Sequence, residues 1–157
     1  MKKGIPAFLL LTLFAAPSIT LAESGSSGRI EVLIDNVRSA SGVVGVALFS
    51  AKKGFPDKSS MAVEGRSVPA GKSCKVIFEN VPYGAYAVSV LHDENGNGKM
   101  DKGVFGIPKE GFGVSNNPEI KMGPPSFAES RFDLKSRELI LNIGMKYLRK
   151  PETQVRQ

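Results

Sequence analysis

The chain has 157 residues, a formal net charge of +6 at pH 7, 41% hydrophobic residues and 23% charged residues. These values are typical of one globular domain and argue against a wholly disordered chain. A single cysteine and a single histidine exclude an intrachain disulfide framework and any zinc or copper site built from several such residues.

The first 22 residues are typical of a bacterial export signal. Two lysines precede an apolar run from Ala7 to Ala16, and Thr20 and Ala22 place small residues before a cut at Glu23. The run is short for a bilayer span, although an uncleaved membrane anchor is the alternative. We therefore expect a signal peptide at residues 1–22 and an exported protein, periplasmic or secreted.

After a flexible leader at residues 23–28, apolar and polar residues alternate with a period of two, as in half-buried strands. Turn signals rich in glycine and proline separate these runs, and no long window favours an amphipathic helix. The pattern predicts strands at 29–37, 43–49, 73–79, 85–92, 127–134 and 138–147, with a short strand near 61–63. We expect an all-β fold, an antiparallel β-sandwich of about seven strands, as one domain over residues 29–148. Residues 149–157 form a C-terminal tail.

Residues 93–126 interrupt the alternation. This stretch is dense in glycine, asparagine and proline, and loops of such length are uncommon unless they are functional or disordered. It also carries apolar residues. We therefore expect a long ordered loop excursion at one end of the sandwich, anchored by Phe105, Ile107, Phe112 and Met122.

The clearest local motif runs from Asp93 to Asp101 and reads D-x-N-x-N-G-x-x-D. Ca²⁺ takes about six to eight oxygen ligands, from side chains at alternate loop positions and a backbone carbonyl, and a glycine at the sixth position permits the turn. The spacing predicts a weak Ca²⁺ site with a dissociation constant of about 10⁻⁴–10⁻³ M. Its ligands would be the side chains of Asp93, Asn95, Asn97 and Asp101 and the carbonyl of Lys99.

The motif departs from an EF-hand at its twelfth position, which is Val104 rather than a glutamate. A seventh oxygen would have to come from elsewhere, and Glu94 and Glu110 are the nearest acids. The two Asn-Gly pairs in this segment also favour a tight turn that binds no metal, and this remains the alternative.

Catalysis has one candidate base, because His92 is the only histidine. It lies beside the Asp93 loop, on the face that carries Val88 and Val90, so a buried histidine with a structural hydrogen bond is the alternative. No nucleophile elbow, P-loop or dinucleotide fingerprint is present. A possible binding surface would combine His92 with Glu110, Ser115, Asn116 and Asn117.

Basic residues gather near the C-terminus, at Arg131, Lys135, Arg137, Lys146, Arg149, Lys150 and Arg156. In an exported protein they favour contact with an envelope protein, a polysaccharide or an anionic membrane surface. A solvated strand face with a frayed tail is the alternative. The export signal argues against nucleic acid as a partner.

Several blocks of the mature chain carry a family resemblance. The segments GVVGVALFS, FENVPYGAYAVSVLHDENGNGKMD, GIPKEGFGVSNN and GPPSF resemble an exported bacterial family, domain of unknown function 2141, over about residues 30–147. The resemblance implies one prealbumin-like or immunoglobulin-like domain and no known activity. The stretch from Phe78 to Val88 is also similar to the strand–turn–strand of prealbumin-like repeats in surface proteins, which are mostly structural or binding modules.

These observations predict an exported, non-enzymatic β-sandwich with a Ca²⁺ site in an end loop and a ligand- or partner-binding surface. Two alternatives stay open. The first is a small periplasmic hydrolase or isomerase that uses His92 with acids and amides of the loops. The second is an envelope interaction module that uses the basic C-terminal strand.

Overall fold

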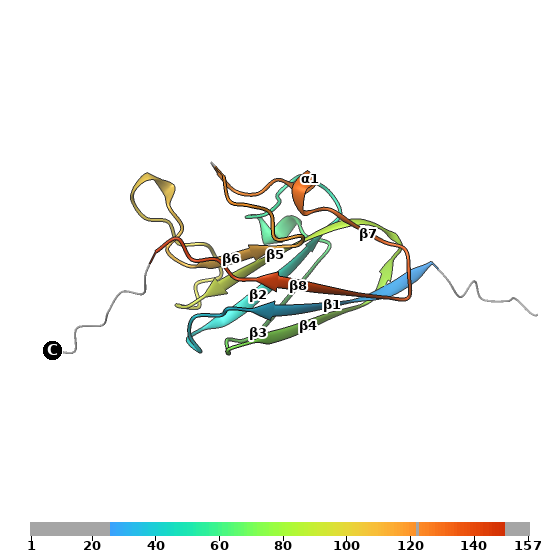
Figure 1. Cartoon of the computed structure of the whole chain (residues 1–157), viewed down its shortest axis with the longest axis horizontal. Coiled ribbons are helices and arrows are strands. Elements are labelled where there is room, and N and C mark those ends of the chain that lie inside the picture. Colours follow the sequence, from blue (N-terminus) through green and yellow to red (C-terminus); the bar gives the residue numbers. More distant parts are fainter. Residues whose placement is uncertain (1–25, 122, 150–157) are drawn as a thin grey trace, which may run out of the picture.

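The computed structural model describes residues 26–121 and 123–149 (Figure 1). The predicted signal peptide, residues 23–25 of the leader and residues 150–157 of the tail lie outside the described residues. The strands are β1 (Ser27–Asp35), β2 (Val43–Phe49), β3 (Glu64–Pro69), β4 (Cys74–Pro82), β5 (Gly84–Asp93), β6 (Gly111–Val114), β7 (Phe132–Leu134) and β8 (Glu138–Gly144). Three short helical segments are the 3₁₀ turns Ser59–Met61 and Val104–Gly106 and the helix α1 (Phe127–Ser130).

The strands form two sheets, and the predicted β-sandwich is confirmed. One sheet has the order β4-β1-β8, and the other has the order β3-β2-β5-β6, with β7 paired to the first three residues of β5. The predicted antiparallel pairing holds except between β1 and β8, which are parallel. This exception arises because β7 returns the chain to the end where β1 begins, and the amide of Arg29 there donates to the carbonyl of Arg137 at 2.9 Å.

The core lies between the sheets, and the period-two pattern explains it. Alternate residues of β1 and β4 are buried from one sheet. From the other sheet, β2 and β5 bury their inward residues and also consecutive residues at 46–49 and 86–88, where the outer face is covered as well. The fully or nearly fully buried side chains include Ile30, Val32, Ile34, Phe78, Val44, Leu48 and Val88. Burial of one such side chain contributes about 1.5–3 kcal/mol. The Tyr86 hydroxyl also donates to the carbonyl of Pro82 at 2.9 Å, which fixes the corner where the chain passes from β4 to β5.

Three expectations about local structure differ from the structure. The segment 127–134 does not begin as a strand, because a capping box starts α1: the Ser126 hydroxyl accepts from the amide of Glu129, and the Glu129 carboxylate accepts from the amide of Ser126. The region near 61–63 follows a 3₁₀ turn, and the strand lies later, at β3. The predicted leader also ends earlier, since β1 includes Ser27 and Gly28.

The irregular region after β5 is ordered but is held differently from the prediction. It contains β6, a strand that the sequence pattern did not indicate. Phe105, expected as an apolar anchor, is 96% exposed, and Ile107 is 39% exposed. Met122 lies outside the described residues. The loop therefore depends on polar contacts more than on an apolar anchor, as the next section describes.

Candidate functional site

The end loop, residues 93–110, leaves the end of β5 and returns as β6, at one end of the sandwich (Figure 1). Asp93 is 3% exposed, and its carboxylate accepts hydrogen bonds from the backbone amides of Gly96 (2.7 Å), Asn97 (3.1 Å) and Gly98 (2.7 Å). The φ angles of Gly96 and Gly98 are 74° and 75°, a left-handed conformation that favours glycine. One buried carboxylate therefore holds the first half of the loop.

Three further residues of the predicted Ca²⁺ set lie together in this loop. The side-chain amides of Asn95 and Asn97 donate to the Asp101 carboxylate at 2.7 and 3.1 Å. Their amide oxygens accept from the backbone of Asn97 and Lys99. Among the described residues, no group of three histidine, cysteine, aspartate or glutamate side chains is placed to hold a metal ion. The oxygens gathered here come from amides as much as from carboxylates.

Glu110, the last residue of the loop, joins the start of the loop to its middle. It is 4% exposed, and its carboxylate accepts from the backbone amide of Glu94 at 3.1 Å and from that of Asp101 at 3.0 Å. Of the two acids expected to supply a seventh oxygen, Glu110 is therefore the one that contacts the backbone of the motif. Its carboxylate is buried rather than part of an open surface.

Glu94 has a different partner. Its carboxylate forms an ion pair with the Arg38 guanidinium and accepts from the Ser39 hydroxyl at 2.9 Å. The hydrogen bond from Arg38 lowers the pKa of Glu94, and the bond from Ser39 adds to this effect. Arg38 also lies over the Tyr147 ring, with its guanidinium carbon 4.5 Å from the ring centroid. These contacts tie the start of the loop to the β1–β2 connection and to the C-terminal segment.

His92 is fully buried next to this network. Its Nδ1 lies 2.8 Å from the Tyr147 hydroxyl, and its Nε2 lies 2.9 Å from the carbonyl of Ser41. Because a carbonyl can only accept, Nε2 carries the proton, and Nδ1 accepts from Tyr147. Burial raises the pKa of Tyr147, which keeps that hydroxyl protonated as the donor. Within the described residues, neither nitrogen of the imidazole is hydrogen-bonded to a serine hydroxyl or to a carboxylate.

The remaining residues of the predicted binding surface form their hydrogen bonds with partners other than His92. Ser115 is fully buried; its hydroxyl accepts from the amide of Val88 and donates to the carbonyl of Ser130. Asn116 and Asn117 are exposed, with φ angles of 65° and 45°. The Asn116 amide donates to the carbonyls of residues 129 and 131, and the Asn117 side chain bonds residues 142 and 144 of β8. Each side chain bonds the chain's own backbone.

The basic C-terminal region is partly neutralised. Arg131 and Lys135 both pair with Asp133, at 2.9 and 3.1 Å. The Lys146 ammonium donates to the carbonyl of Pro118 at 2.6 Å. Three of the basic residues thus have partners within the protein, and Lys150 and Arg156 lie outside the described residues.

A groove of about 710 Å³ lies beside the end loop, over the outer face of the five-stranded sheet. Its lining includes Gly45 and Ala47 of β2, Gly65 of β3 and Ser89 of β5. Sequence reasoning missed this groove, since it predicted no strand at Gly65 and could not tell which strands are neighbours. The available signal was the run of small residues at outward positions, which matters only once the pairing of the strands is known.

The comparisons with known proteins give one match. The model of a family described as an uncharacterized protein conserved in bacteria (DUF2141) matches residues 32–141. No curated protein and no solved structure matches the chain. Within residues 26–121 and 123–149, no helix combines the length and the apolar character that a membrane span needs.

Proposed function

The chain belongs to the DUF2141 family of bacterial proteins, and from this premise we propose that it is an exported, non-catalytic β-sandwich whose end loop binds Ca²⁺. Export rests on the N-terminal pattern of residues 1–22, with cleavage before Glu23. The mature chain then carries one domain at residues 29–148. In an extracellular or periplasmic setting, a weak Ca²⁺ site can be filled by the surrounding medium.

The observation that carries the proposal is the arrangement of the segment 93–101 around its two aspartates. The Asp93 carboxylate accepts three loop amides, and the Asn95 and Asn97 side chains both reach Asp101. These hydrogen bonds hold the segment in one arrangement, although Asn95 and Asn97 are exposed to solvent. A ligand that binds such a loop has little ordering entropy to overcome.

The amides would have to turn for a cation to bind. In the structure, the NH₂ groups of Asn95 and Asn97 donate to the Asp101 carboxylate. They therefore occupy the positions around this carboxylate where a bound cation would lie. Rotation of each amide by about 180° exchanges nitrogen and oxygen, and this terminal torsion is soft. The amide oxygens would then face the same point as Asp101, with the carbonyl of Lys99 and the carboxylate of Asp93 completing the set.

Two features support a binding role over a catalytic one. Both nitrogens of His92 are satisfied inside the protein, and the ring is fully buried. A general base needs to reach a substrate proton within about 2.6–3.2 Å, directly or through one water molecule. The hydrolase or isomerase alternative would therefore require the end of the sandwich to open.

Calorimetric titration of the metal-stripped protein with Ca²⁺ tests the proposal. We expect binding with a dissociation constant of about 10⁻⁴–10⁻³ M, and we expect Asp101→Asn to weaken it by about tenfold or more through loss of one ligand charge. Asp133→Asn is the matched control, because Asp133 lies opposite Ala85 in the strand pairing of β5 with β7, at the end of β5 that is remote from the loop. No heat of binding in the wild type, or equal binding by Asp101→Asn, would contradict the proposal.

A further inference from the structure

The groove over the five-stranded sheet is hollow because its floor lacks side chains. Gly45 pairs with Ser67 and Leu91, and the next outward residue, Ala47, pairs with Gly65 and Ser89. The smallest residues of three strands therefore lie side by side. A Cβ placed on Gly45 would lie 3.9 Å from the Leu91 carbonyl oxygen, and one on Gly65 would lie 4.0 Å from that of Val46, with no closer contact beyond the chain neighbours. Larger side chains at Gly45 and Gly65 would project into open space. The floor is more covered at Ala47, which is 6% exposed, and at Ser89, whose hydroxyl donates to the carbonyl of Pro56 at 3.0 Å.

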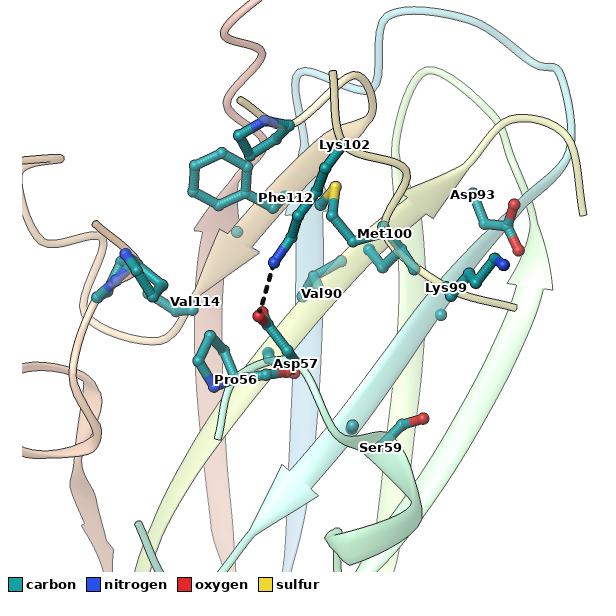
Figure 2. Close-up of a pocket in the computed structure, with 18 of the residues that line it drawn as sticks. Pro56, Asp57, Ser59, Val90, Asp93, Lys99, Met100, Lys102, Phe112 and Val114 are labelled. Atoms are coloured by element: carbon teal, nitrogen blue, oxygen red, sulfur yellow. Dashed lines mark hydrogen bonds and ion pairs between the residues drawn. The ribbon is translucent and has the colours of Figure 1, made fainter. Parts of the chain in front are cut away.

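The walls of the groove are mostly apolar. Met100 of the end loop and Phe112 and Val114 of β6 line it (Figure 2). Ile107 and the consecutive prolines at 124 and 125 also belong to its lining. Phe105 is at its rim, 96% exposed and at a φ of 61°. Contiguous exposed apolar surface of this kind, with Phe105 beside it, is typical of a ligand-binding groove. A volume of about 710 Å³ lies within the range of about 300–1,000 Å³ that small-molecule sites occupy.

The charges around the groove favour an anion. Its charged lining consists of Arg66, Lys99, Lys102, Lys121, Asp57 and Asp93. Both acids are engaged: Asp57 pairs with Lys102 at 3.4 Å (Figure 2), and Asp93 accepts three loop amides. Arg66 pairs with Glu64. Among the described residues, Lys99 and Lys121 form no ion pair. The pKa of Glu129 is lowered by hydrogen bonds from Ser126 and also by the charge of Lys121. The lining holds four basic and two acidic side chains, so positive charge is in excess.

We propose that this groove binds an amphiphile with an apolar chain and an anionic head group, of which a fatty acid is the simplest member. The chain would lie over Gly45, Ala47 and Gly65, and the head group would lie beside Lys99 and Lys121. An added peptide strand is disfavoured, because the floor is the face of a sheet in which β2 already pairs on both edges. The proposal goes beyond Ca²⁺ binding and does not depend on it.

Calorimetric titration with decanoate tests this proposal, with decanol and decyltrimethylammonium as neutral and cationic molecules of equal chain length. The buffer contains a chelator, because Ca²⁺ precipitates long-chain carboxylates, and the result is then independent of the Ca²⁺ site. We expect decanoate to bind at one site and more tightly than either control molecule. Failure of decanoate to bind below its micelle concentration, or equal binding of the cation, would overturn the proposal.

Variants locate the binding site. Gly45→Val and Gly65→Val place a β-branched side chain on the floor, at strand positions that tolerate it, and each should weaken decanoate binding by at least about tenfold. The double variant Lys99→Gln, Lys121→Gln should weaken decanoate by about tenfold and leave decanol unchanged. Only the backbone of Lys99 is a candidate Ca²⁺ ligand, so Ca²⁺ binding should persist in this variant.

The control is Lys72→Gln, an exposed lysine in the β3–β4 turn that does not line the groove. It should bind decanoate as the wild type does. Melting temperatures close to that of the wild type would show that the variants are folded. The two valine variants lie on separate strands, so the test can still be made if one of them does not fold. Wild-type affinity in both folded valine variants would place the ligand elsewhere and overturn the proposal.

Discussion

Replacement of Asp93 by alanine should loosen the end loop selectively. The carboxylate accepts three amide hydrogen bonds, at 2.7, 3.1 and 2.7 Å, and is 3% exposed. A hydrogen bond to a charged group contributes about 1.5–3 kcal/mol. Because Gly96, Asn97 and Gly98 lie on the exposed part of the loop, water can recover part of this energy when the carboxylate is lost. We therefore expect Asp93→Ala to destabilise the protein by about 2–4 kcal/mol.

The effect of Asp93→Asn should be about half as large, since the asparagine oxygen can still accept but carries no charge. Denaturant unfolding in the presence of a chelator measures both changes without a contribution from Ca²⁺. Amide hydrogen exchange should show faster exchange at residues 96–98 in Asp93→Ala, while β1 and β4 keep their protection. A wild-type unfolding midpoint together with unchanged exchange at residues 96–98 would refute the role given to Asp93.

Three further outcomes are expected. Val88→Asp places a charge at a fully buried position and should cost about 3 kcal/mol or more, whereas Ser89→Asp, on the outer face, should cost about 1 kcal/mol; the reverse order of denaturant midpoints would disprove the register. Arg38 lowers the pKa of Glu94 from its ordinary value of 4.5. The unfolding free energy of the wild type should therefore exceed that of Glu94→Gln by its full amount above about pH 4.5, and this difference should shrink as the pH falls below that value. A difference that does not change with pH would contradict this. The intact mass of the exported form should correspond to a chain that begins at Glu23, and a mass that includes residues 1–22 would exclude cleavage.

The alternation of apolar residues was enough to predict the sandwich and most of its core, because inward and outward positions of a strand are fixed by local geometry. Ile30, Val32 and Ile34, the alternating apolar residues of the first predicted strand, are fully buried. β6 was missed because a four-residue segment with two glycines carries too little alternation. The helix α1 was missed although its capping box, Ser126 to Glu129, is legible in the sequence.

The candidate sites also depend partly on local contacts and partly on contacts between distant parts of the chain. The hydrogen bond from the Gly96 amide to Asp93 and the one from Asn95 to Asp101 both lie within residues 93–101, so they are local contacts in the segment that the motif marks. The partners of His92 are 51 and 55 positions away in the chain, and only the fold brings them together. The groove depends on small residues from three strands that become neighbours through pairing. Long-range pairing is what single-sequence periodicity does not contain.

Ca²⁺ binding by the end loop is tested most directly by the melting temperature in chelator and in 10 mM Ca²⁺, a concentration about tenfold above the weak end of the expected range of dissociation constants. Binding to the folded state alone then stabilises by about 1.4 kcal/mol, which should raise the melting temperature by about 3–6 °C. Magnesium should do much less, and Asp101→Ala should abolish the increase. Identical melting curves in chelator and in Ca²⁺ would contradict the proposed site and leave the β-sandwich intact.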